Sequence, residues 1–107
     1  MPLYGIKGNK CFEAINTGIR GWHQFGSNRT IPAGESESFS ISLEGLDLPD
    51  DEYPVIAVSP VIQPGETFKQ DIVYYTYLDS NNAAFVIVCQ NNTESPQAEL
   101  IVNYVIL

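Results

Sequence analysis

The residues of this chain that could support catalysis are few, and they do not form a known catalytic pattern. The chain has one histidine, His23, and no Ser-x-x-Lys, Gly-x-Ser-x-Gly or His-Glu-x-x-His motif. His23 would therefore have to be the general base for any serine or cysteine nucleophile. With Trp22 and Phe25 as its neighbours, His23 fits a partly exposed position in a strand equally well. A carboxylate pair of the glycosidase type stays open, but the acidic residues lie mainly in turns, so we expect no enzyme.

Acidic and asparagine-rich segments are the candidates for metal binding and glycosylation. The run from Asp47 to Glu52 contains side chains that could supply oxygen ligands to calcium. It lacks the Asp-x-Asp-x-Asp-Gly spacing that places alternate carboxylates around one ion, so we interpret it as a solvated loop and predict no metal or other cofactor. Asn28-Arg29-Thr30 and Asn91-Asn92-Thr93 match the glycosylation acceptor pattern, and we interpret both as turns.

Aromatic residues are the main candidates for a binding surface. Tyr75 and Tyr77 share one face of a predicted strand, and Trp22 and His23 are neighbours in another. Exposed Tyr and Trp suit binding because they offer a large contact area at low entropic cost. We therefore predict a ligand or partner surface, either a sugar platform or a protein interface, at Trp22, His23, Tyr75 and Tyr77. Core filling remains the alternative for each of them.

Strands are the elements that would position these side chains. Between Glu37 and Glu44, for example, Phe39, Ile41 and Leu43 alternate with serines, which indicates one buried and one wet face. The predicted strands, separated by turn signals, are 3–7, 9–15, 20–25, 37–44, 54–62, 67–78, 83–90 and 97–106. With no helical period, the pattern predicts an all-β antiparallel sandwich of seven or eight strands, Ig-like or jelly-roll-like. We expect a single domain over residues 1–107, with 1–8 an arm or an edge strand.

The stretch from Ala83 to Leu107 is predicted to form a β-hairpin with a longer loop. Its first strand is apolar on both faces, so it must be covered by a facing sheet and also by a loop or by another copy of the molecule. The predicted interface between copies contains Phe85, Ile87, Tyr104 and Ile106. For Cys11 and Cys89 we favour two free, buried thiols, and a disulfide between facing sheets stays open.

The composition excludes several classes of function. With 107 residues, 44% hydrophobic and 17% charged, the chain fits one globular domain. Its 13 acidic and 5 basic residues give a net charge of -8, which leaves no basic footprint for nucleic acid or for an anionic membrane. No apolar run approaches the ~20 residues of a membrane span. The N-terminus lacks the apolar core of a signal peptide, so synthesis in the cytoplasm is expected.

From Phe39 onward the order of features resembles the H-type lectin-like sandwich. An alternating strand and an acidic loop precede the segment Pro54-Val55-Ile56-Ala57-Val58-Ser59, and a long middle strand follows. The strand Phe85-Val86-Ile87-Val88 and the closing strand Glu99 to Ile106 complete the pattern. The family's closing strand usually carries a Trp near its end, where this chain has Asn103-Tyr104-Val105, and its sugar-contacting residues find no position-by-position match.

The resemblance implies a trimeric sandwich of the kind found in secreted sugar-binding proteins and in bacteriophage tail and fibre proteins. We therefore expect a non-enzymatic structural protein of a phage virion, a fibre, baseplate or capsid-decoration component. It would act as a homo-oligomer, with a closed trimer favoured, and its partners would be other virion proteins. The alternative is a carbohydrate-binding module for glycans of the host surface or elsewhere.

Overall fold

The computed structural model of the chain describes residues 4–7, 10–13, 19–44, 55–67 and 69–106. Within these residues every regular element is a strand, so the predicted all-β class is confirmed. The strands are β1 (Tyr4–Lys7), β2 (Lys10–Glu13), β3 (Ile19–Phe25), β4 (Ser36–Ser42), β5 (Ile56–Pro60), β6 (Ile72–Asp79), β7 (Ala84–Asn91) and β8 (Leu100–Ile106).

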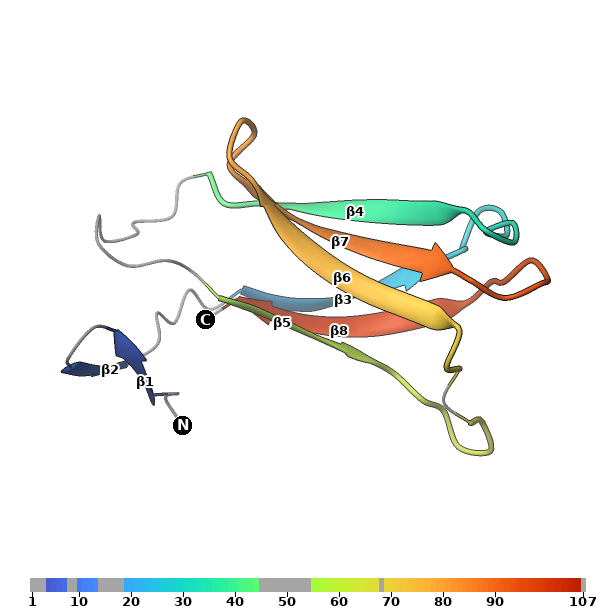
Figure 1. Cartoon of the computed structure of the whole chain (residues 1–107), viewed down its shortest axis with the longest axis horizontal. Coiled ribbons are helices and arrows are strands. Elements are labelled where there is room, and N and C mark those ends of the chain that lie inside the picture. Colours follow the sequence, from blue (N-terminus) through green and yellow to red (C-terminus); the bar gives the residue numbers. More distant parts are fainter. Residues whose placement is uncertain (1–3, 8–9, 14–18, 45–54, 68, 107) are drawn as a thin grey trace.

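Two three-stranded antiparallel sheets make up the main body of the fold. One has the order β3-β8-β5 and the other the order β4-β7-β6, and they lie as two layers (Figure 1). β1 and β2 form a separate two-stranded sheet. The predicted seven or eight strands are therefore too many for the main sheets, which contain six. The reason is that the two N-terminal strands pair with each other and add no strand to either main sheet.

The predicted terminal hairpin is wrong, because β7 and β8 lie in different sheets. Each of them is the central strand of its own sheet, with β4 and β6 beside β7 and with β3 and β5 beside β8. The segment between them crosses from one layer to the other and pairs on the way through an isolated bridge between Ile31 and Gln97. In this arrangement each of the two apolar strands has a paired neighbour on both edges, and both direct side chains into the core between the sheets.

The strand boundaries agree with the local sequence signals in one segment and differ from them in another. The two prolines in the segment 54–62 predicted a strand start, an edge or a bulge, and β5 is an edge strand that ends at Pro60. β6 begins at Ile72, five residues later than predicted. Two turns precede it, closed by hydrogen bonds from Glu66 N to the Gln63 carbonyl (2.9 Å) and from Ile72 N to the Lys69 carbonyl (3.3 Å).

The core contains apolar side chains from both main sheets. Its fully buried members are Phe25 of β3, Ile87 and Cys89 of β7, and Val102 and Ile106 of β8. The alternation predicted for the segment 37–44 is confirmed, since Ile41 and Leu43 are buried, Phe39 packs partly buried against them, and the serines of β4 are exposed. This core packs the two sheets against each other, and each sheet has one outward face.

β7 is buried on both faces, as its composition predicted. Phe85, Ile87 and Cys89 point into the core, while Val86 and Val88 on the outer face are only 4% and 5% exposed. The register places Tyr77 beside Val86 and Tyr75 beside Val88. These larger neighbours stand within reach of the valines across the strand pair, so we attribute the second cover to them.

Asn91, at the end of β7, fixes the crossing between the sheets. Its side chain is fully buried, and Nδ2 donates to the carbonyl oxygens of Ile31 (2.8 Å) and Ser95 (2.9 Å). Its Oδ1 accepts a hydrogen bond from the backbone N–H of Thr93 (2.9 Å). This amide is the acceptor position of the second glycosylation pattern. It lies at the end of β7 and not in a turn as predicted, and its burial leaves it inaccessible to modification.

Candidate functional surfaces

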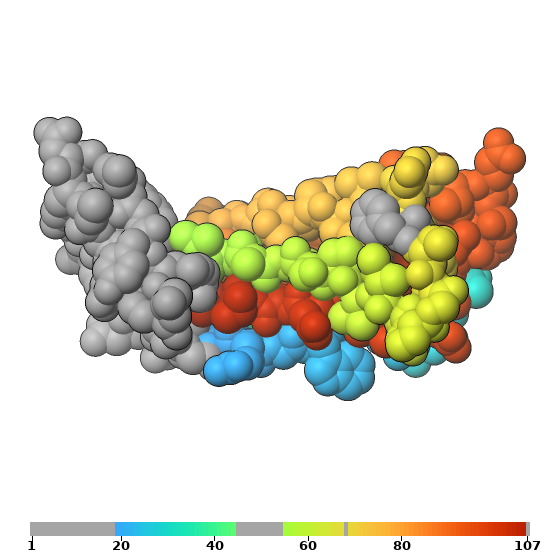
Figure 2. Space-filling model, turned by 90° about the horizontal axis from the view of Figure 1, so that it is seen from below, coloured from blue at the N-terminus to red at the C-terminus, as the bar shows by residue number. Residues whose placement is uncertain are grey.

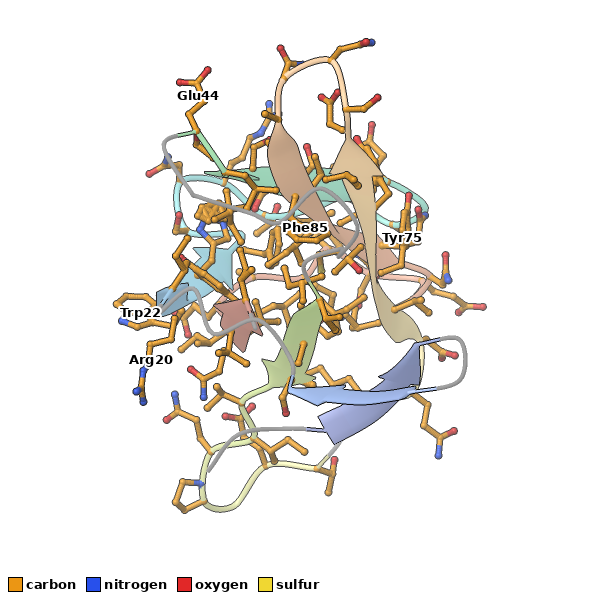
Figure 3. The ribbon with its side chains drawn as sticks, turned by 90° about the vertical axis from the view of Figure 1, so that its left-hand side faces the viewer. Arg20, Trp22, Glu44, Tyr75 and Phe85 are labelled. Atoms are coloured by element: carbon orange, nitrogen blue, oxygen red, sulfur yellow. The ribbon has the colours of Figure 1, made fainter. Side chains whose placement is uncertain are left out.

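The four residues predicted to form one binding surface lie on three different faces. Trp22 points outward from the β3-β8-β5 sheet and is 65% exposed. His23, the next residue along the strand, points inward. Tyr75 and Tyr77 lie on the outer face of the other sheet, so Trp22 and Tyr75 are on opposite sides of the molecule, with Phe85 between them (Figure 3).

His23 is an aromatic component of the core. Its ring stacks on Phe39 with centroids 4.0 Å apart and planes 4° from parallel, and its edge meets Phe25 at 4.6 Å. Burial lowers the pKa of His23 below its usual 6.5, an effect that the charge of Glu37 partly opposes. No hydrogen bond joins His23 to a hydroxyl or a thiol among the described residues. Its position therefore suits packing and gives no support to general base catalysis.

Cys89 is a free thiol, as predicted, and it is buried. It lies opposite Tyr74 in the register and shares a hydrogen bond with it. Burial raises the pKa of the Cys89 thiol to about 11 and also raises the pKa of Tyr74. A buried thiol that stays protonated is a poor nucleophile, so Cys89 acts as a small core residue. The side chain of Cys11 lies outside the described part of the chain.

The residues predicted to form the oligomer interface pack inside one chain. Phe85, Ile87 and Ile106 are 7%, 0% and 0% exposed, and Tyr104 packs against the same core. Gly21 leaves room for this tyrosine, because a Cβ at Gly21 would lie 2.7 Å from the Tyr104 hydroxyl. A surface between copies would therefore need other residues. The apolar side chains of these strands pack in the core of a single chain, so they are not exposed for contact with another copy.

The outer face of the β4-β7-β6 sheet is the first candidate surface. We call it the tyrosine face, and it consists of Val73, Tyr75 and Tyr77 of β6, Val86 and Val88 of β7, and Ser38, Ser40 and Ser42 of β4. Tyr75 and Tyr77 are 49% and 50% exposed. Asp71 and Asp79 lie at the two ends of the β6 row, and the Asp79 carboxylate accepts hydrogen bonds from Asn81 N (3.2 Å) and Asn82 Nδ2 (2.7 Å) in the adjoining turn.

The outer face of the β3-β8-β5 sheet is the second candidate. A shallow hollow on it, which we call the tryptophan face, presents Arg20 and Trp22 of β3, Asn103 and Val105 of β8, and Ala57 and Ser59 of β5. Figure 2 looks onto this face, where the three strands lie side by side. Arg20, Ser59 and Asn103 were not predicted from the sequence, because they come together only through the pairing of three strands distant in sequence.

The described residues contain neither a candidate metal site nor a candidate membrane-spanning helix. Among them, no group of three or more His, Cys, Asp or Glu side chains is placed to hold a metal ion. The acidic segment Asp47 to Glu52 lies outside the described residues. Within the described part of the chain, no helix has the length and apolar character needed to cross a bilayer.

Comparison with known proteins does not assign the chain to a family. No family model, no curated protein and no solved structure matches it.

Proposed function

We propose that this protein is a non-enzymatic β-sandwich that assembles with copies of itself through the tyrosine face. The core shared by the two three-stranded sheets supports the sandwich. The resemblance to H-type lectin-like domains supports an Ig-like or jelly-roll-like topology and a closed trimer. It also supports a place in a phage virion, as a fibre, baseplate or capsid-decoration component with other virion proteins as partners.

The observation that carries the assembly proposal is the exposure of Val73, Tyr75 and Tyr77. These side chains are 42%, 49% and 50% exposed, in a continuous row along β6. Contact surfaces between proteins are enriched in tyrosine and depleted of charge at their centre. The tyrosine face has both properties at its centre, because the charged residues next to it along β6, Asp71 and Asp79, lie at its two ends.

Electrostatics favours the same face for contact between copies. Each chain carries a net charge of -8, so two copies repel one another over most approaches. An uncharged face permits close contact without placing like charges opposite each other. The exposed tyrosine rings would bury apolar area there, and their hydroxyl groups would keep hydrogen-bond partners in water or on the other copy.

The size of the face sets the expected strength. Three strands about 4.8 Å apart and seven residues with a rise of about 3.4 Å give roughly 14 by 24 Å. That area is about half of the ~800 Å² that each partner contributes to a stable interface. An assembly built on this face alone should therefore dissociate on dilution, and a tight trimer would need a further contact surface.

Light scattering across a dilution series tests the proposal. We expect an oligomer that dissociates as the concentration falls, and we expect Tyr77→Glu to be monomeric because it places a carboxylate in the contact. Ile62→Glu is the matched control, since Ile62 is also 50% exposed but lies away from the tyrosine face. A wild-type monomer at every concentration, or equal effects of the two variants, would overturn the proposal.

A further inference from the structure

The tryptophan face carries an exposed aromatic ring next to three polar side chains. Among the described residues, Arg20 and Asn103 make no side-chain hydrogen bond, and the Ser59 hydroxyl donates only a long one, 3.4 Å, to the Pro60 carbonyl. Trp22 is 65% exposed, the largest exposed fraction among the large hydrophobic side chains that the structure describes. The Arg20 guanidinium, two residues earlier on the same face of β3, makes no ion pair with any described residue. Figure 3 shows both side chains projecting from the same side of the strand. An arrangement of this kind is suited to a ligand with both an apolar and a charged part.

The strand register arranges these side chains in two rows. Trp22 is paired with Asn103, which is paired in turn with Ser59, and this row runs across the three strands. The second row contains Arg20, Val105 and Ala57. The first row spans about 10 Å, and the two rows are about 7 Å apart. Ala57 is the smallest side chain of the second row, so this row is lowest at the edge strand β5.

The dimensions of the hollow suit a small ligand. Its two rows of side chains cover about 10 by 7 Å, which matches one or two sugar rings. The apolar face of a pyranose presents C–H groups that pack against the electron-rich face of an indole. The amide of Asn103 and the hydroxyl of Ser59 can both donate and accept hydrogen bonds with sugar hydroxyls.

The charge on this face selects among sugars. Arg20 is the only charged side chain in the two rows, although the chain as a whole has a net charge of -8. A guanidinium binds a carboxylate through two parallel hydrogen bonds, which a neutral sugar cannot offer. We propose that the tryptophan face binds a pyranose that carries a carboxylate. In the complex Trp22 stacks on the ring, Arg20 pairs with the carboxylate, and Asn103 and Ser59 bind the hydroxyls.

Titration by NMR with methyl glucuronide and with methyl glucoside, its neutral counterpart, tests the proposal on the full chain. We expect the acidic sugar to bind about five- to tenfold more tightly than the neutral one at low salt, with the difference shrinking as salt screens the pair. Arg20→Gln should remove that preference and leave the neutral sugar unaffected. Trp22→Ala should weaken both sugars about tenfold, since stacking does not depend on charge.

Two controls separate a built site from general effects. Arg29→Gln removes an exposed arginine of the loop after β3 and should leave the preference intact. Tyr77→Glu alters the opposite face, so sugar binding and assembly can succeed or fail independently. Equal affinity for the two sugars, no binding of either at millimolar concentrations, or an equal loss in Arg29→Gln and Arg20→Gln would overturn the proposal. Far-UV circular dichroism would verify that each variant is folded.

Discussion

Replacing Asn91 by alanine is expected to destabilise the fold by about 3 kcal/mol. The substitution removes the two donors to the Ile31 and Ser95 carbonyls and the acceptor for the Thr93 N–H. The Ile31 carbonyl lies in buried surroundings, so losing its partner costs about 1–3 kcal/mol. The other two groups are partly buried and can recruit water, so each loss is nearer to about 0.5–1 kcal/mol. The total is a large fraction of the roughly 5–15 kcal/mol that stabilises a domain.

Urea unfolding followed by circular dichroism would measure this effect. We expect a lower midpoint with an unchanged slope, and a melting temperature lower by roughly 12 °C for a domain of this size. Asn92→Ala is the matched control, because Asn92 is the next residue, is exposed and makes no side-chain hydrogen bond among the described residues. It should change stability by less than about 0.5 kcal/mol. A loss below about 1 kcal/mol for Asn91→Ala, or equal losses in both variants, would refute the argument that this amide secures the crossing between the sheets.

Asn91→Asp separates the donors from the acceptor. The variant keeps an acceptor for the Thr93 N–H but sets a buried carboxylate against two carbonyl oxygens. Burial and this repulsion should raise the pKa of the new carboxyl group above its unfolded value. The variant should therefore be least stable at neutral pH and should regain stability as the pH falls and the group takes up a proton. A stability difference from the wild type that does not shrink between pH 7 and pH 5 would contradict this account.

Three further variants test local packing and the pH dependence of stability. Gly26→Ala should destabilise the fold by more than about 2 kcal/mol, because φ is +73° and the new Cβ would lie 2.8 Å from the Ala98 Cα. Gly34→Ala, with φ +81° and nothing within 4 Å of the new Cβ, should cost only about 1–2 kcal/mol of backbone strain. Thermal melts would measure both losses. Equal losses would show that the close approach at Gly26 is unimportant. Since the pKa of His23 is lowered in the folded state, the unfolded chain takes up the proton first below pH 6.5, so stability in urea should fall from pH 7 to pH 5.5. His23→Phe should flatten that dependence, and an unchanged slope would contradict it.

Local sequence signals were sufficient for the strands themselves. The alternation of serine with Phe39, Ile41 and Leu43 specifies which face of β4 is buried, because side chains alternate across any extended strand. The same rule places Trp22 and His23 on opposite faces of β3. Their grouping into one binding surface was therefore avoidable from the sequence, and the inward position of His23 required only the strand assignment.

Strand pairing was not available from local signals. β7 and β8 are consecutive, apolar and separated by turn residues, which is the pattern of a hairpin, yet they lie in different sheets. Nothing near Asn91 in the sequence shows that its amide binds Ile31, sixty residues away. Which strands become neighbours depends on how the apolar side chains of all the strands pack together in one core. Local signals also did not show that Phe85 and Ile106 would be buried in the core of a single chain.

The sequence by itself therefore determined the all-β class, most of the strands, the two-sided burial of β7 and the net negative charge. These follow from residue type and a period of two, which act over a few neighbouring residues. Only the tertiary structure decided that Tyr75 and Tyr77 face away from Trp22, and that Arg20, Asn103 and Ser59 share one hollow. Such groupings depend on the register between strands that are distant in the chain, and that register is set by the packing of the core.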